Sequence, residues 1–144
     1  LADRRIPAVP LPDGGGRVRV IAGSFQGSQG PAETYTPLKL WDVQLKAGAA
    51  AEFALEEGHS LVVLVSRGAV TFNGDKAAAA AELAIFDRKG RGLSVAAQKD
   101  ARLLLMSGEP IDEPVVGHGP FVMNRPAEIR QAILDYQEGR MGSL

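Results

Sequence analysis

The chain has 144 residues, the usual size of one domain, and a chain of this length buries roughly two-thirds of its unfolded surface. Its 16 basic and 17 acidic residues are interspersed and give a formal charge of −1, so no long-range field attracts nucleic acid or anionic lipid. The absence of cysteine excludes disulfides and thiolate chemistry and fits a cytoplasmic location. The longest apolar runs are too short to span a membrane.

Residues 1–16 are expected to form a linker or N-terminal arm. Pro7, Pro10 and Pro12 stiffen this stretch, and three consecutive glycines at 14–16 make its end flexible. Because the chain begins at Leu1 and not at methionine, we expect the natural product to start further upstream.

Residues 17–124 are expected to form a β-barrel, because short apolar and β-branched runs alternate there with turn residues. We expect strands over residues 17–22, 38–46, 51–55, 61–66, 69–73, 83–86, 93–96 and 102–107. In the second of these, Leu38 and Leu40 share one phase, whereas Trp41, Val43 and Leu45 share the other. This strand therefore needs a bulge or burial on both faces, and Trp41 is expected to point inward.

Two turn-rich segments are expected to be hairpin tips. Asn73-Gly74 suits the positive φ angles of a tight reversal, and residues 88–92 suit a looser one. The alanine-rich segment 77–81 is too short to nucleate a helix and is expected to be a loop.

From Pro126 the apolar period changes to that of a helix, expected over residues 125–139. Ile129, Ala132, Ile133 and Tyr136 form one stripe, Asn124 is the expected N-cap, and Gly139 can close the helix. About eight strands followed by one helix indicate an all-β jelly-roll barrel with a C-terminal α-helix.

The sequence also resembles a known family. Residues 113–124, EPVVGHGPFVMN, with the helix that follows them, resemble the C-terminal signature of the pirins. Residues 17–23, RVRVIAG, the turn at 27–32 and Thr36-Pro37-Leu38 are similar to the start of that family's second half. The resemblance covers nearly the whole chain and implies a cupin-type double-stranded β-helix, one of two such halves in a pirin.

The resemblance implies that the metal of a pirin, iron or a similar divalent ion, is held by histidines and a glutamate in the N-terminal half. Some members of the family are quercetin 2,3-dioxygenases, and others are partners of transcription factors. No metal, cofactor or catalytic residue is therefore expected in the C-terminal half itself.

The ligand positions of this chain agree with that expectation. A cupin metal motif can be placed between Gly48 and Gly68, where its ligand positions become Ala54, Glu56 and Leu61. No histidine occurs between Ser60 and Gly117, although a cupin metal site needs about three protein ligands. His59 is interpreted as a turn residue and His118 as part of a packed bend.

The main hypothesis is a structural and interaction role beside a metal-bearing N-terminal cupin half, with self-association or another protein as further partners. Neither nucleic acid nor a membrane is expected as a direct partner. The expected interface comprises Phe121, Val122, Met123, Ile129, Ile133 and Tyr136. The competing interpretation is that these side chains pack within their own domain.

Two alternatives stay open, and with them whether the chain is an enzyme. The barrel interior, with Trp41, Phe53, Phe72 and Phe86, could bind a small apolar molecule without reacting with it, although such aromatics also simply fill a core. In the other alternative the chain is a stand-alone metal-dependent dioxygenase.

Overall fold

The structure is a computed structural model that describes residues 3–142. Residues 1 and 2, the start of the predicted linker, lie outside the described residues. The chain divides into two compact units, Leu1–Pro110 and Ile111–Leu144.

The first unit consists almost entirely of strands, with two short 3₁₀ helices near its start, Asp3–Arg5 and Pro12–Gly14. Its strands are β1 (Ala8–Pro10), β2 (Gly16–Ala22), β3 (Ser24–Phe25), β4 (Ser28–Gln29), β5 (Leu38–Leu45), β6 (Ala50–Ala54), β7 (Ser60–Arg67), β8 (Ala69–Phe72), β9 (Lys76–Ala79), β10 (Glu82–Phe86), β11 (Gly92–Ala97) and β12 (Ala101–Gly108).

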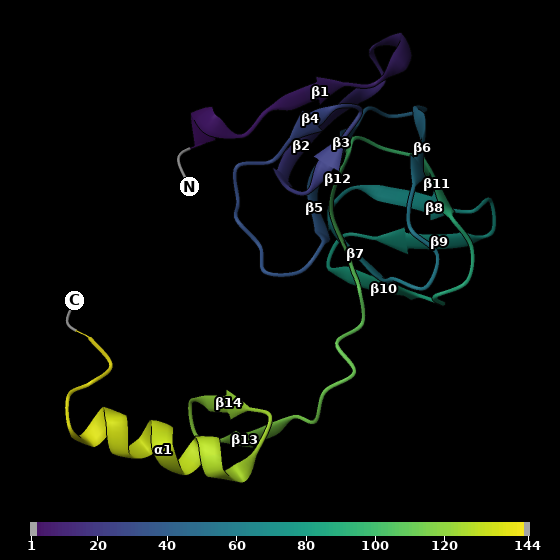
Figure 1. The fold of residues 1–144 in the computed structure, drawn as a ribbon. Helices are drawn as coiled ribbons and strands as arrows, with labels where there is room; N and C mark the ends of the chain where they lie inside the picture. The colour runs from purple at the N-terminus through teal and green to yellow at the C-terminus, as the bar shows by residue number, and fades with distance from the viewer. Residues whose placement is uncertain (1–2, 143–144) are drawn as a thin grey trace. The chain divides into compact units, whose positions relative to one another are not determined.

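These strands form two main antiparallel sheets (Figure 1). The six-stranded sheet has the order β1-β2-β5-β12-β7-β10, and the four-stranded sheet has the order β6-β11-β8-β9. The short strands β3 and β4 form a separate ribbon. Because neighbours in a sheet are far apart in sequence, as β5 and β12 are, the chain crosses repeatedly between sheets, as in a jelly roll.

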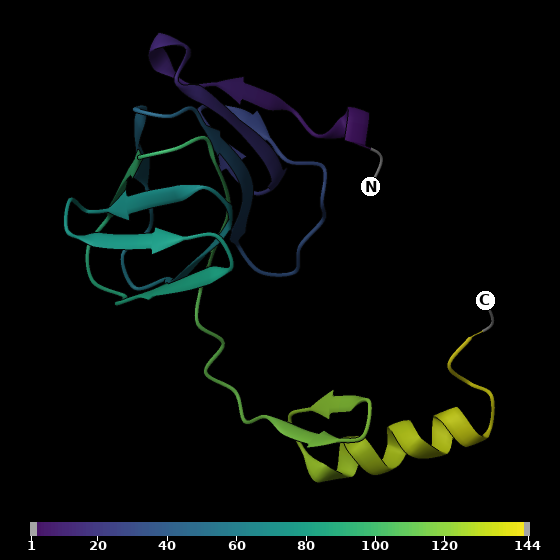
Figure 2. The same cartoon turned by 180° about the vertical axis from the view of Figure 1, so that it is seen from behind.

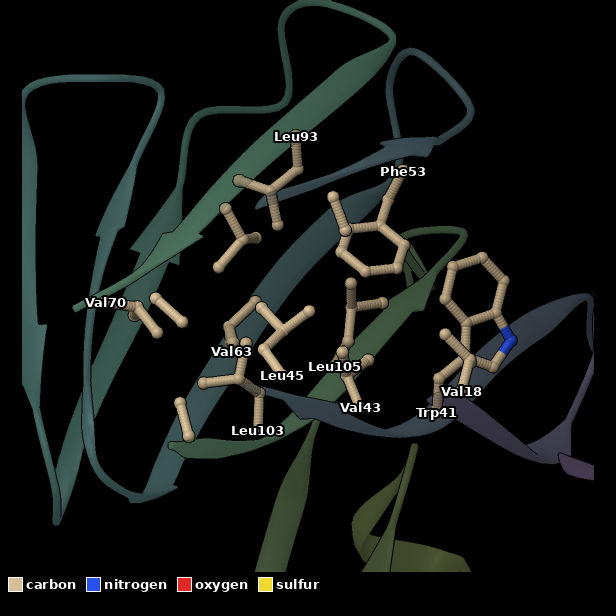
Figure 3. Packing of buried hydrophobic residues seen from close by; sticks show 14 of the residues in the cluster. Val18, Trp41, Val43, Leu45, Phe53, Val63, Val70, Leu93, Leu103 and Leu105 are labelled. Carbon is tan, nitrogen blue, oxygen red and sulfur yellow. The ribbon is translucent and has the colours of Figure 1, made fainter. Parts of the chain in front are cut away.

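The core lies between the inward faces of the two sheets. Alternate residues of each strand point into it, so β12 contributes Leu103 and Leu105, whereas Arg102 and Leu104 point outward. Figure 3 shows how these side chains fill the interior. The largest fully buried side chains are Trp41, Phe53, Phe72, Leu93, Leu103, Leu105, Val18, Val20, Val43, Val63, Val65 and Val70. The predicted all-β barrel and the inward position of Trp41 are confirmed.

All eight predicted strands are present, with ends that differ by at most one residue. The expected loop at 77–81 is wrong for its first part, because β9 (Lys76–Ala79) pairs with β8, and Figure 2 shows the two strands side by side. Within the expected linker, Ala8–Pro10 forms β1 on the edge of the six-stranded sheet. A proline is tolerated there because an edge strand leaves N–H positions unpaired.

The two expected hairpin tips differ. Asn73 and Gly74 have φ angles of 50° and 79° and join the paired strands β8 and β9, which confirms the tight reversal. Residues 88–92 do not form a hairpin tip, because they join β10 of the six-stranded sheet to β11 of the four-stranded sheet. A loop rich in glycine and charged residues indicates a reversal of the chain, but it does not predict which sheet the next strand joins.

The second unit contains a hairpin of β13 (Val116–His118) and β14 (Phe121–Met123), followed by α1 (Pro126–Gln137). The helix is confirmed, and Gly139 closes it with a φ of 70°. The N-cap is Arg125 and not Asn124, whose side chain instead donates to the carbonyl of Pro114 at 2.9 Å. Residues 111–124, which we expected to belong to the barrel, group with the helix.

Candidate functional site

The mouth of the barrel is the end where β5, β7 and β11 begin and β6, β8, β10 and β12 end. It is the natural candidate site because polar residues converge there from several strands. An open cleft of about 300 Å³ at this end is lined by Glu56, His59, Phe86 and Ser107, among others. A neighbouring cleft of about 410 Å³ shares Glu56 and His59 and adds Lys39.

Strand alternation brings a lysine into this mouth. Lys39 has the same phase as the buried residues Trp41 and Val43, so its side chain points inward and is only 15% exposed. Its ammonium group binds the carboxylate of Glu56 and lies 5.9 Å from the centroid of the Trp41 ring. The aliphatic stem is thus buried while the charge is neutralised by a partner.

Electrostatics at the mouth centre on Glu56. The hydrogen bond from the Lys39 ammonium group, aided by its positive charge, holds the pKa of Glu56 below its ordinary value, although partial burial opposes the shift. His59 Nδ1 lies 4.0 Å from Glu56 Oε2. The carboxylate of Glu56 is therefore already paired with the ammonium group of Lys39, a residue of the same domain.

Two polar atoms near the mouth are buried and make no hydrogen bond with the described residues. They are Ser107 Oγ on β12 and Trp41 Nε1 on β5. Ser107 lies opposite Lys39 on β5 and Leu61 on β7, in the row of residues that closes the core below the mouth. Ser107 is one of the residues that line the cleft of about 300 Å³, and its buried hydroxyl has no hydrogen-bond partner among the described residues.

The donor set at the mouth does not fit a divalent metal. Ala54 has no donor, Leu61 is buried in the core, and Glu56 is bound to Lys39. Within residues 3–142 there is no group of three or more histidine, cysteine, aspartate or glutamate residues that could hold a metal. Glu56 and His59 by themselves fall short of the roughly three ligands that such a site requires.

The second histidine lies in the other compact unit. His118 lies in β13 of the second unit, where its residue is exposed. We expected it to pack in a bend; instead it occupies a hairpin strand opposite Phe121.

The aromatic residues expected inside the barrel are core residues. Trp41, Phe53 and Phe72 are each about 1% exposed, and Phe86 is half-buried against the core. The rings pair with each other: the ring centroids of Trp41 and Phe53 are 6.0 Å apart, and those of Phe72 and Phe86 are 5.3 Å apart. Figure 3 shows Trp41 and Phe53 next to each other in the interior. Sequence reasoning missed Phe25, whose ring is 5.0 Å from that of Trp41, because it lies in a strand of only two residues.

The expected interface residues all lie in the second unit but differ in exposure. Ile129 is buried within that unit, and Phe121, Met123 and Ile133 are half-buried. Val122 and Tyr136 are 67% and 69% exposed, so they are the members of the set that a partner could still cover. Their role as an interface stays a prediction.

A search for a membrane-spanning helix within residues 3–142 found none of sufficient length and apolarity.

Comparisons with known proteins agree on one family. The model of the Pirin C-terminal cupin domain matches residues 40–142. The chain is 49% identical over 140 residues to a Pseudomonas aeruginosa protein named "Putative quercetin 2,3-dioxygenase", a match that covers 97% of this chain and 49% of that protein.

Solved structures support the same conclusion. A quercetin 2,3-dioxygenase from Acinetobacter baumannii is 38% identical with a TM-score of 0.92, over 99% of this chain and 50% of that one. A bacterial pirin from Escherichia coli, solved in complex with nickel(II), shares the fold with a TM-score of 0.54 and 22% identity, over 65% of this chain and 40% of its own. This chain thus spans about half the length of the relatives it matches. It belongs to the pirin family, of which it contains the C-terminal cupin domain.

Proposed function

We propose that this chain is a non-catalytic cupin domain that supports a metal-bearing cupin half of a pirin-like protein by contact. The observation that carries the proposal is the Lys39–Glu56 ion pair in the barrel mouth. A divalent ion at this carboxylate would have to displace an ammonium group that is already bound. The described residues also place no third such ligand with Glu56 and His59.

The relatives supply the context for this role. The A. baumannii relative is a quercetin 2,3-dioxygenase by name, and the E. coli pirin was solved with nickel(II). We infer that the metal and the oxygenase chemistry of a pirin-like parent, with iron or a similar ion, reside in the half that this chain does not match. The present chain then contributes a stable barrel and contact surface. A regulatory contact with another protein is compatible with the same role.

Metal titration tests the proposal directly. The purified chain, incubated with Fe(II) or Ni(II) and passed through a desalting column, should retain well under one ion per chain by elemental analysis. Retention of one ion per chain that is lost in Glu56→Gln and His59→Gln, but not in Glu57→Gln, would contradict the proposal. Glu57 is the matched control because it lies next to Glu56 but faces Arg91.

A second candidate function rests on the unpaired Ser107 hydroxyl. Inside the barrel, Trp41 packs against Phe53 and Phe72 packs against Phe86, so these rings fill the interior themselves. A small-molecule site is therefore expected at the mouth. A ligand there would enter the cleft of about 300 Å³ and hydrogen-bond Ser107 Oγ. Thermal-shift titration with quercetin tests this candidate, since Ser107→Ala should abolish a saturable shift and Ser66→Ala should not.

A further inference from the structure

The end of the barrel opposite the mouth has an open cleft of about 700 Å³, larger than either cleft at the mouth. It lies where β5 and β7 end and where β2 and β12 begin. Its lining contains four cationic residues, Arg17, Lys46, Arg67 and Arg102, and among the described residues that line it only Asp100 is acidic. A cleft of this volume is in the range that accommodates a small molecule.

The register of the six-stranded sheet places three arginines in one row beside this cleft. Arg17 on β2, Gln44 on β5, Arg102 on β12 and Arg67 on β7 are successive neighbours across the strands. The row lies on the outward face, because Leu103, the residue that follows Arg102, points into the core.

A β-bulge brings Arg67 into this row. Arg102 pairs with Arg67, whereas the next residue of β12 pairs with Val65. Ser66 is therefore an extra residue in β7, and its Oγ donates to the carbonyl of Arg102 at 2.9 Å. Strict alternation would turn Arg67 to the same side as the buried Val65, but the extra residue turns it outward. The bulge thus places Arg67 directly opposite another cation, an arrangement that destabilises a sheet.

Three of the cations in the cleft have no anionic partner in the described part of the chain. Arg17, Lys46 and Arg67 are exposed. Within residues 3–142, no carboxylate lies within 4.0 Å of a charged nitrogen of these three side chains. Arg17 Nε donates instead to the neutral amide oxygen of Gln44 at 3.0 Å.

Two carboxylates of this part of the barrel have other partners. Asp42 is bound by Arg19 at 3.1 Å and by Arg102 at 2.6 Å. Asp100 accepts a hydrogen bond from the backbone N–H of Ala47 at 2.9 Å and so holds the turn that follows β5. The three cations without an ion pair therefore share the cleft with one carboxylate that already has a structural role.

We propose that this cleft binds a small molecule that carries at least two carboxylate or phosphate groups. The planar guanidinium group of arginine matches both kinds of group through paired N–H donors, and lysine adds a compact positive charge. Arg17 and Arg67 lie three strand spacings apart, about 14 Å at the backbone, and Lys46 follows the strand next to that of Arg17. One small anion cannot reach both ends of the row, so the ligand needs separate anionic groups. The inference is independent of the proposed function, which concerns the mouth.

Calorimetric titration of the 144-residue chain tests the proposal, with citrate and pyrophosphate as probes and with the ionic strength held constant by sodium chloride. At least one probe should bind at a single saturable site. Acetate and inorganic phosphate, which carry one anionic group each, should bind at least about tenfold more weakly, because they lose charge-assisted hydrogen bonds. Binding of citrate but not pyrophosphate would identify the ligand as a carboxylate, and the reverse would identify it as a phosphate.

Variants of the cleft connect the binding with its residues. Arg67→Gln and Lys46→Gln should each weaken the binding of the probe by about tenfold or more, and Arg67→Lys should weaken it less than Arg67→Gln. Lys76→Gln is the matched control, because it removes the same charge from an 80% exposed side chain at the mouth, and it should change the affinity by less than about twofold. The bound probe should also raise the midpoint of thermal unfolding of the parent chain, and less so in Arg67→Gln.

Three results would overturn the inference. Neither citrate nor pyrophosphate shows saturable binding at millimolar concentration. The binding is unchanged in both Arg67→Gln and Lys46→Gln, which would place the anion elsewhere on the chain. The loss in Lys76→Gln equals the loss in Lys46→Gln, which would attribute the effect to net charge. Circular dichroism of the variants identifies a loss of fold, which is not expected because all the substituted side chains are exposed.

Discussion

The barrel mouth and the outward face of the six-stranded sheet share several strands, yet they differ in how their charged and apolar side chains are paired or covered. At the mouth, the charge of Glu56 is neutralised by Lys39, and the described residues there offer too few ligands for a metal. On the outward face, Asp42 is bound by Arg19 and Arg102, but the apolar side chains of Leu83 and Ile85 remain exposed. The charges at the mouth are thus paired within the domain, whereas the outward face leaves apolar side chains in contact with water.

Interior and outward positions should differ most in their effect on stability. Phe53→Ala should lower the free energy of unfolding by about 3–5 kcal/mol, because Phe53 is 1% exposed and its ring contacts Trp41 and Phe25. Urea denaturation followed by Trp41 fluorescence measures the loss. A cost below about 1 kcal/mol would show that the barrel interior is not closely packed.

The buried carboxylate on the outward face should have the next largest effect. Asp42→Asn should cost about 1–3 kcal/mol near neutral pH, because Arg102 and Arg19 lose their shared acceptor charge. Burial by itself would raise the pKa of Asp42, but hydrogen bonds and charge from Arg102 and then Arg19 outweigh it and hold the pKa below its usual value of 3.8.

This lowered pKa fixes the sign of a pH dependence. A carboxylate with a folded pKa below its unfolded value stabilises the fold above the unfolded pKa, and the contribution is lost as pH falls through the folded pKa. The stability difference between the parent chain and Asp42→Asn should therefore be constant above about pH 5 and shrink below about pH 4. A difference that stays the same down to pH 2 would contradict the ionic role of Asp42.

The ion pair at the mouth should contribute less. Lys39→Met should change the free energy of unfolding by less than about 1 kcal/mol, because Glu56 is 54% exposed and water screens the pair. It should nevertheless raise the pKa of Glu56 toward its ordinary value, which NMR titration of the carboxyl carbon measures. Lys76→Met, at an 80% exposed site, is the control and should leave the pKa of Glu56 unchanged.

The exposed apolar side chains on the outward face of the six-stranded sheet should have the smallest effect in the chain by itself. Ile85→Ser should alter the free energy of unfolding by no more than about 0.5 kcal/mol, because its side chain is mostly in water already. Chemical denaturation of Ile85→Ser, carried out in parallel with Phe53→Ala, measures this change in the free energy of unfolding. A loss of 2 kcal/mol would mean that Ile85 is part of the barrel's own core and would remove the contrast between the two regions.

Much of the local structure could be predicted because it depends on local chemistry. Strand alternation located all eight predicted strands, and Asn73-Gly74 identified a tight turn because the two residues accept positive φ angles. The phase of Leu38 and Leu40 against Trp41 also indicated a strand with apolar residues on both faces. The pairing of β5 with β12 is regular and Leu40 lies on the outward face, while the irregularity is in the neighbouring strand β2, between Val20 and Ala22, opposite Trp41 and Leu40.

What the sequence by itself determined is the alternation of apolar and polar residues, the C-terminal helix and the shortage of metal-binding side chains, because each is a property of neighbouring residues or of composition. Only the tertiary structure decided that the alanine-rich segment becomes β9, that residues 88–92 cross between sheets, and that Lys39 meets Glu56. The register of β5, β12, β7 and β10 likewise brought Leu40, Met106, Val62 and Ile85 from four distant segments into one outward row. The physical reason is that pairing between strands is a long-range choice, set by how the two sheets close around one core.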